Sequence, residues 1–201
     1  MDVLWLAGEV FEPRTSGLYE YSGLLADTIA ESYDVRFIGR RRVDFVADTL
    51  PDSWTVLAPR HRSNLRRALS KWPTKIGDVM GEDYIEAVTE ALREEPRVVV
   101  IDHMRAAGVI DLLGDIPYVY VSHNDEWAVK KLATEGQSRL YARVAFWADT
   151  WKHKMFENRL LEGAALVTTI TPEDAQSLGA RTRSRIEYAC LLYTSPSPRD
   201  S

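Results

Sequence analysis

The chain has 201 residues, of which 45% are hydrophobic and 27% are charged, and its net charge is −5. These values are typical of a globular protein with one sizeable core, and the acidic balance argues against a nucleic-acid-binding protein. The sequence has no apolar run near the roughly 20 residues that span a membrane, and its N-terminal segment lacks the basic start of a signal peptide. Its one cysteine excludes an internal disulfide. We therefore expect one large cytoplasmic domain.

The first 39 residues predict a strand–helix–strand unit. A continuous apolar run at 2–7 indicates a buried strand, and the loop that follows carries Pro13 and Gly17. Apolar residues at helical spacing predict a helix over 18–33, and a second strand is expected at 34–39. The crossover of such a unit is right-handed.

Strands and helices continue to alternate along the rest of the chain. Thr171 is expected to cap the last helix, with Pro172 at its first position and Asp174 at its third. The long helix places Leu140, Val144, Trp147, Trp151 and Met155 along one face. The alternation predicts an α/β fold with a doubly wound parallel sheet. The further strands are expected at 54–59, 97–102, 117–122 and 165–170, and the further helices at 62–72, 81–95, 106–113 and 138–163.

The C-terminal segment 190–201 does not fit this pattern. Its Ser-Pro-Ser-Pro stretch can neither continue a helix nor join a sheet interior. The segment resembles one reading frame of a sequencing-library adapter, and a disordered natural terminus is the alternative. We therefore expect the native domain to cover residues 1–189.

Two predicted strands end on histidines, His103 after RVVVID and His123 after PYVYVS. In a parallel α/β sheet, ligands bind beyond the carboxyl ends of the strands, so this edge is the candidate active site. His61 and His153 lie among basic residues, and we expect both in solvated helices. The sequence has no H-E-x-x-H motif, Walker A loop or G-x-G-x-x-G turn, so no metal or cofactor is expected.

The order of motifs resembles the N-terminal domain of the two-domain GT-B glycosyltransferases of family 4. The resemblance rests on the first strand with its Gly-containing loop and helix, on the strand ending IDH, on VYVSHNDEW, and on FENRLLEGAALVTTITPEDAQSL. The chain departs from the family pattern at Ser16-Gly17, where a Gly-Gly pair is usual, and at Ala164-Ala165, where Ala-Asp is usual.

The resemblance implies half of an enzyme. The whole enzyme would transfer a sugar, with retention, from a nucleotide sugar to a sugar, a lipid-linked or a small-molecule acceptor. In this family a second domain supplies the donor-binding carboxylate motif, which residues 1–189 do not contain, so we expect the fragment to be inactive alone. Two other functions stay open: a nucleotide-sugar epimerase with the GT-B fold, and a non-enzymatic module that binds a ligand or a partner.

The same resemblance suggests roles for individual residues. His123 is the candidate catalytic residue, facing the donor sugar, and its alternative is a structural histidine at a strand end. Ser16 and Gly17 begin a helix, where backbone N–H groups favour the phosphates of the donor. The candidate acceptor-binding residues are Glu9, Arg14, Asp102, His103, Asn124 and Glu126.

One basic stretch stands out in this acidic chain. Residues 60–75 contain six Lys or Arg and no acidic residue. One interpretation is a peripheral contact with an anionic membrane surface, and the other is a solvated helix whose Leu65, Leu69 and Trp72 pack on the core. The candidate membrane-contacting residues are Arg62, Arg66, Arg67 and Lys71.

Overall fold

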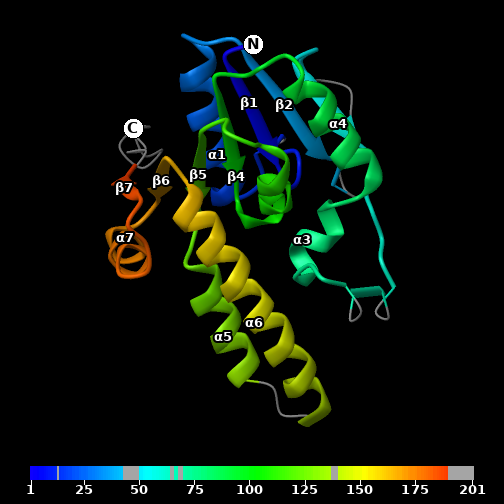
Figure 1. Cartoon of the computed structure of the whole chain (residues 1–201), viewed down its shortest axis with the longest axis vertical. Helices are drawn as coiled ribbons and strands as arrows, with labels where there is room; N and C mark the ends of the chain where they lie inside the picture. Colours follow the sequence, from blue (N-terminus) through cyan, green and yellow to red (C-terminus); the bar gives the residue numbers. More distant parts are fainter. Residues whose placement is uncertain (13, 43–49, 64–65, 68–69, 137–139, 190–201) are drawn as a thin grey trace, which may run out of the picture.

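The computed structural model describes residues 1–12, 14–42, 50–63, 66–67, 70–136 and 140–189. They form a seven-stranded sheet in the order β3-β2-β1-β4-β5-β6-β7, in which every neighbouring pair is parallel (Figure 1). The strand order runs outward in opposite directions from the β1–β4 pair, and a crevice forms at such a switch point. The predicted doubly wound parallel sheet is confirmed.

Six of the seven strands lie where apolar runs predict them. The exception is β7, whose sequence RIEY is mostly exposed at the sheet edge and has no apolar run. The strands are β1 (Val3–Ala7), β2 (Val35–Arg40), β3 (Trp54–Leu57), β4 (Val98–Asp102), β5 (Tyr118–Ser122), β6 (Leu166–Thr169) and β7 (Arg185–Tyr188).

The helices agree with the sequence less closely. The prediction missed α3, which is short, and gave no range for α5, whose sequence EWAVKKLATE is half polar. The helix expected at 106–113 is a 3₁₀ helix at 104–112, and the helix expected at 62–72 lies partly outside the described residues. The helices are α1 (Gly17–Ala30), α3 (Thr74–Val79), α4 (Glu82–Leu92), η1 (Met104–Leu112), α5 (Glu126–Glu135), α6 (Leu140–Gly163) and α7 (Pro172–Gly179).

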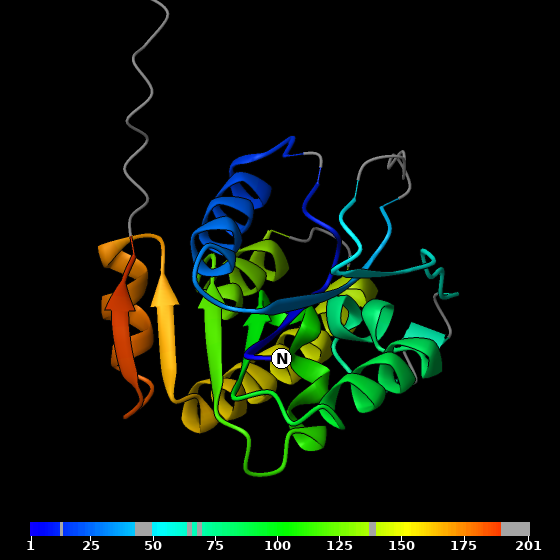
Figure 2. The same cartoon turned by 90° about the horizontal axis from the view of Figure 1, so that it is seen from above.

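The two faces of the sheet carry separate cores. On one face, Leu6, Ile101 and Tyr120 pack with residues of α3, α4, η1 and α6. On the other face, Trp5 and Val100 pack with residues of α1. Figure 2 shows α1 on the opposite side of the sheet from α4. The carboxyl ends of the strands therefore lie between helices from both faces.

The α5–α6 hairpin extends away from the sheet (Figure 1). Trp147, Trp151 and Met155 share a face of α6, but that face is exposed, while His153 and Glu157 are fully buried. The face of α6 that the apolar spacing predicts to be buried is therefore exposed. The outer part of α6 extends beyond the sheet and does not pack against it (Figure 1). The side chains of Leu140 and Val144 lie outside the described ones. Among the described helices, none is both long and apolar enough to cross a membrane.

Candidate functional site

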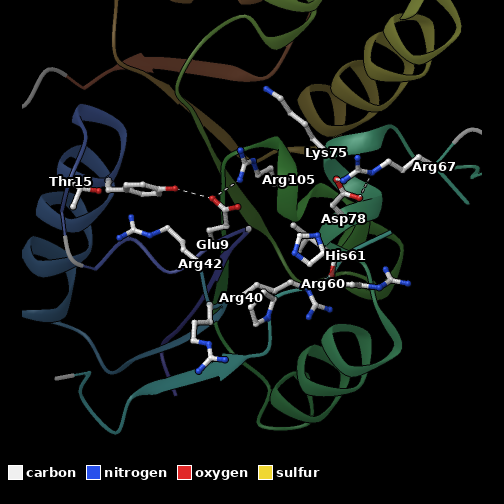
Figure 3. A pocket seen from close by; sticks show the side chains of 15 residues that line it. Glu9, Thr15, Arg40, Arg42, Arg60, His61, Arg67, Lys75, Asp78 and Arg105 are labelled. Carbon is white, nitrogen blue, oxygen red and sulfur yellow. Dashed lines mark hydrogen bonds and ion pairs between the residues drawn. The ribbon is translucent and has the colours of Figure 1, made fainter. Parts of the chain in front are cut away.

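A cavity of about 440 Å³ opens at the carboxyl ends of β1, β2 and β3 (Figure 3). Its walls come from the segments that follow these strands, from α3, and from the start of α1. The volume suits a small-molecule ligand. The side chains and backbone that line it belong to Gly8, Glu9, Thr15, Tyr19, Arg40, Arg41, Arg42, Pro59, Arg60, His61, Arg67, Lys75, Asp78, Val79 and Arg105.

This cavity is strongly basic. Seven of its lining residues are Lys or Arg and one is a histidine, against only two carboxylates, Glu9 and Asp78. The chain as a whole has the opposite balance, a net charge of −5. The positive charge is therefore concentrated at the place where the fold binds ligands.

A polar bridge separates the larger cavity from a smaller one of about 130 Å³. The Tyr19 hydroxyl donates to Glu9 Oε2 over 2.8 Å, and Arg105 Nη1 pairs with the same oxygen at 2.5 Å. Burial and the hydrogen bond to Glu9 raise the pKa of the Tyr19 hydroxyl, so it remains a donor. Glu9, Tyr19 and Arg105 line both cavities, which makes the two spaces parts of one site.

Asp102, the last residue of β4, lies at the wall of the smaller cavity. Its carboxylate accepts hydrogen bonds from Trp5 Nε1 at 3.2 Å, Ser22 Oγ at 3.1 Å and His123 Nε2 at 2.7 Å. These donors come from β1, α1 and the end of β5, so they fix the carboxylate at the point where the three elements meet. Asp102 is thus a buried acceptor held in one orientation.

His123 lies behind Asp102 and lines neither cavity. Its ring is buried, with the Tyr21 ring edge-on at 5.5 Å and the His103 ring at 5.6 Å. Nε2 contacts Asp102, and within the described part of the chain Nδ1 has no hydrogen-bond partner. The expected contact of His123 with a sugar stays a prediction.

His103 lines the smaller cavity and connects the end of β4 to η1 and α5. Its φ of 68° is in the left-handed region, which costs a residue other than glycine free energy and is frequent at functional sites. Nδ1 accepts the backbone N–H of Arg105 at 3.1 Å, and Nε2 lies 3.0 Å from Glu126 Oε1. Burial lowers the pKa of the His103 ring. The ring is therefore a neutral donor to Glu126.

Glu126 ties α5 to this site. It is buried, and Lys75 Nζ of α3 lies 2.8 Å from its Oε2. Burial opposes ionisation, but the hydrogen bond from His103 and the charge of Lys75 outweigh it and hold the pKa of the Glu126 carboxyl well below its usual range. Because its oxygens are engaged by His103 and Lys75, Glu126 supports the wall of the site.

A further buried carboxylate, Glu157, was missed by the sequence reasoning. It accepts the backbone N–H of Glu126 at 2.9 Å and pairs with Arg181 at 2.6 Å. Burial raises the pKa of this carboxyl to about 7, although Arg181 opposes the shift. His153, one turn away on α6, is also fully buried, so the expectation that it is solvated was wrong. The sequence feature that could have indicated Glu157 and His153 is the motif FENRLLEG, together with the polar residues just before it in the long helix.

The other predicted residues divide into two groups. Ser16 caps α1 and lines the smaller cavity. Gly17 lines neither cavity, but a Cβ atom there would meet nothing within 4 Å, so its backbone is open to solvent beside Ser16. Arg14 instead pairs with Glu12 and Asp27 and lines neither cavity. Asn124 is exposed and also lines neither. The structure does not bring Arg14 or Asn124 to the site.

The basic stretch 60–75 contributes to the larger cavity through Arg60, His61, Arg67 and Lys75. His61 is exposed as expected, but it lies outside any helix.

Arg62, Arg66 and Lys71 of this stretch do not line the larger cavity. Arg62 donates to the Arg66 carbonyl at 2.7 Å, and Lys71 lies over the Trp72 ring at 4.7 Å. Trp72 packs against Phe156 at 5.1 Å, as in the interpretation with an apolar edge on the core. Leu65 and Leu69 lie outside the described residues.

The sequence reasoning overlooked Arg40, Arg41 and Arg42, all of which line the larger cavity. Their signal was a run of three arginines directly after the second predicted strand. In the part of the chain that the structure describes, no group of three or more His, Cys, Asp or Glu could hold a metal ion.

Comparison with known proteins supports the fold and shows no sequence relationship. No family model matches the chain, and no curated protein matches it. Among solved structures, a sucrose-phosphate synthase from Thermosynechococcus elongatus is similar, with a TM-score of 0.56 and 12% identity over 94% of this chain and 48% of that one. A UDP-glucose:anthocyanidin 3-O-glucosyltransferase in complex with UDP gives a TM-score of 0.51 and 10% identity, over 94% of this chain and 52% of that one. The chain therefore spans about half the length of each, and the fold is that of one half of these glycosyltransferases.

Proposed function

We propose that this chain forms the acceptor-side half of a GT-B glycosyltransferase, which transfers a sugar from a nucleotide sugar to an acceptor bound in the two joined cavities. The observation that carries the proposal is the position of these cavities. They lie beyond the carboxyl ends of β1–β4, on a parallel sheet whose architecture is that of half of two glycosyltransferases. A second domain would close the cleft and supply the donor-binding motif.

The start of α1 is suited to the leaving diphosphate of the donor. Its first N–H groups carry the partial positive charge of a 14-residue helix, and the open space in front of Gly17 lets a phosphate approach the backbone. Charge grows on the diphosphate as the sugar leaves, so donors already oriented toward it stabilise the transition state.

Asp102 and Glu9 are the carboxylates that an acceptor hydroxyl can meet in the smaller cavity. Asp102 is fixed by its three donors, so its remaining lone pairs keep one direction. We assign His123 a positioning role through Asp102, because its ring lies behind this carboxylate. A bound hydroxyl held in this way has a defined orientation toward the anomeric carbon.

The epimerase alternative is less well supported by this site. An epimerase acts on a nucleotide sugar without an acceptor, whereas the larger cavity provides about 440 Å³ beyond the start of α1. This space is what a second substrate needs.

The test is an acceptor-dependence assay on the complete protein, with the gene read downstream of residue 189. Radiolabelled UDP-glucose and GDP-mannose serve as donor probes, with and without a mixture of sugar, sugar-phosphate and lipid-linked acceptors. We expect label to move to an acceptor and turnover to require it. Interconversion of the nucleotide sugar without an acceptor, or no turnover with either donor probe or any acceptor, would contradict the proposal.

A further inference from the structure

We infer that the larger cavity binds a phosphate group carried by the acceptor, so that the acceptor is a phosphorylated sugar or a phosphate-bearing lipid. The inference rests on the proposed function only in taking the bound molecule to be the acceptor. The preference of the cavity for phosphate follows from its own charges and can be measured without sugar transfer.

Four of the seven cationic residues of the cavity are neutralised within the protein. Arg67 pairs with Asp78 at 3.0 Å, and Arg105 pairs with Glu9. Arg40 pairs with Asp83 at 2.6 Å and also donates to two backbone carbonyls, and Lys75 pairs with Glu126. These four hold the walls of the cavity together and contribute little net charge.

Of the other three cationic residues, Arg42 lies over the Tyr19 ring at 4.3 Å, so Arg41, Arg60 and the histidine His61 are left for a ligand. Arg60 donates to the carbonyls of Gly77 and Met80, which orient the guanidinium without cancelling its charge. Arg41 and His61 are exposed, and within the described residues their side chains make no hydrogen bond or ion pair. These three come from the ends of β2 and β3, and Figure 3 shows Arg60 and His61 beside the same space.

The like charges are crowded even beyond the cavity wall. Burial lowers the pKa of the neighbouring Arg62, and Arg60, Arg66 and Arg67 lower it further against the attraction of Asp78. An anion bound nearby would relieve this repulsion. A phosphate fits best, because its tetrahedral oxygens accept from several guanidinium forks at once and its charge exceeds that of a carboxylate.

The donor diphosphate is not the group that this cavity is arranged to hold. The N-cap residue Ser16 lines the smaller cavity and not the larger one, which this part of the chain reaches through Thr15 and Tyr19. The bridge of Glu9, Tyr19 and Arg105 lies between that point and the arginines of β2 and β3. The charges of Arg41 and Arg60 thus point to the second substrate.

The test compares phosphorylated probes with their neutral counterparts on the full chain, by isothermal titration calorimetry. Glucose 6-phosphate against glucose tests a soluble acceptor. Phosphatidylcholine vesicles with and without polyprenyl phosphate test a lipid-linked one. The double variant Arg41→Ala/His61→Ala removes two groups without internal partners among the described residues, so its thermal midpoint should not change. Arg97→Ala, exposed at the opposite ends of the strands, is the matched control.

We expect one of the phosphorylated probes to bind and its neutral counterpart not to bind. The double variant should weaken this binding by about tenfold or more, because charge-assisted hydrogen bonds are lost, while Arg97→Ala binds like the wild type. Binding only to the vesicles assigns the phosphate to a lipid, and binding of glucose 6-phosphate assigns it to a soluble sugar.

The inference is overturned if neither phosphorylated probe binds better than its neutral counterpart, or if the double variant binds it normally. The inference is also overturned if UDP is the only phosphate-bearing probe whose binding weakens in the double variant Arg41→Ala/His61→Ala. Transfer by the complete protein to neutral acceptors only would refute the inference and leave the proposed function standing. Phosphate binding without sugar transfer would refute the proposed function alone.

Discussion

His153 gives a sharp prediction about the dependence of stability on pH. The side chain is fully buried in α6, with Asp149 at 3.7 Å. Burial lowers the pKa of its ring from 6.5 to about 4, against the attraction of Asp149 and together with the repulsion of Lys130. In the unfolded chain the ring takes up a proton near pH 6.5, whereas in the folded chain it stays neutral until about pH 4. The unfolded state therefore binds more protons between these values, and stability falls as pH falls through this window.

The size of the effect follows from the two pKa values. At pH 5 the unfolded ring is almost fully protonated and the folded ring is almost fully neutral, which corresponds to a loss of about 2 kcal/mol relative to pH 7.5. His153→Gln removes this loss. Glu157 titrates in the opposite direction over part of the same window, but it is present in both proteins.

The assay is urea unfolding of the wild type and of His153→Gln at pH 7.5 and pH 5. The difference in unfolding free energy between the two proteins should shift in favour of the variant by about 2 kcal/mol at the lower pH. The exposed His61, changed to Gln, is the control and should show no such shift. An equal pH dependence in the wild type and in His153→Gln would refute the reasoning.

Two further predictions concern the starts of α1 and α7. Gly17→Asp places a carboxylate at the open start of α1 and should raise the KM for the nucleotide sugar in the complete protein without loss of folding, whereas Gly17→Ala should raise it much less; equal KM values would contradict a phosphate site there. Thr171 caps α7 by accepting the Asp174 N–H at 3.1 Å, so Thr171→Ala should lower the unfolding free energy by about 1 kcal/mol in urea. Thr89→Ala, at an exposed position inside α4, should leave the unfolding free energy almost unchanged, and an equal loss in both would contradict a capping effect.

The sheet was predictable because the central strands β1, β4 and β5 are nearly continuous apolar runs, and the other strands expected beside them are short and rich in β-branched and aromatic residues. β7 and α5 were not, because half of the residues in their sequences RIEY and EWAVKKLATE are polar and both elements are held by neighbours distant in the sequence. Asp125, for example, caps α5 and also pairs with Arg181 beyond the last predicted helix. Contacts of this kind, between residues far apart in the sequence, produce no hydrophobic periodicity from which a helix or strand could be predicted.

The site was predictable in its place but only partly in its residues. The strand-end position brought Glu9, Asp102 and His103 to the cavities as expected. It could not show that the His123 ring turns behind Asp102, since a strand end fixes the position of a residue and leaves its rotamer to the packing. The arginines after β2 were visible in the sequence, but their convergence with residues of 60–75 depends on the pairing of β2 with β3.

The measurement that tests the central claim most directly is acceptor-dependent sugar transfer by the complete protein in two variants of His123. The site predicts that His123→Ala lowers kcat by about 100-fold, because Asp102 loses its shortest hydrogen bond and its orientation. His123→Gln, whose amide can still donate to Asp102, should recover much of this loss, and both variants should keep the wild-type far-UV circular dichroism. Transfer by His123→Ala at the wild-type rate would contradict the assignment of these cavities as the acceptor side of a glycosyltransferase.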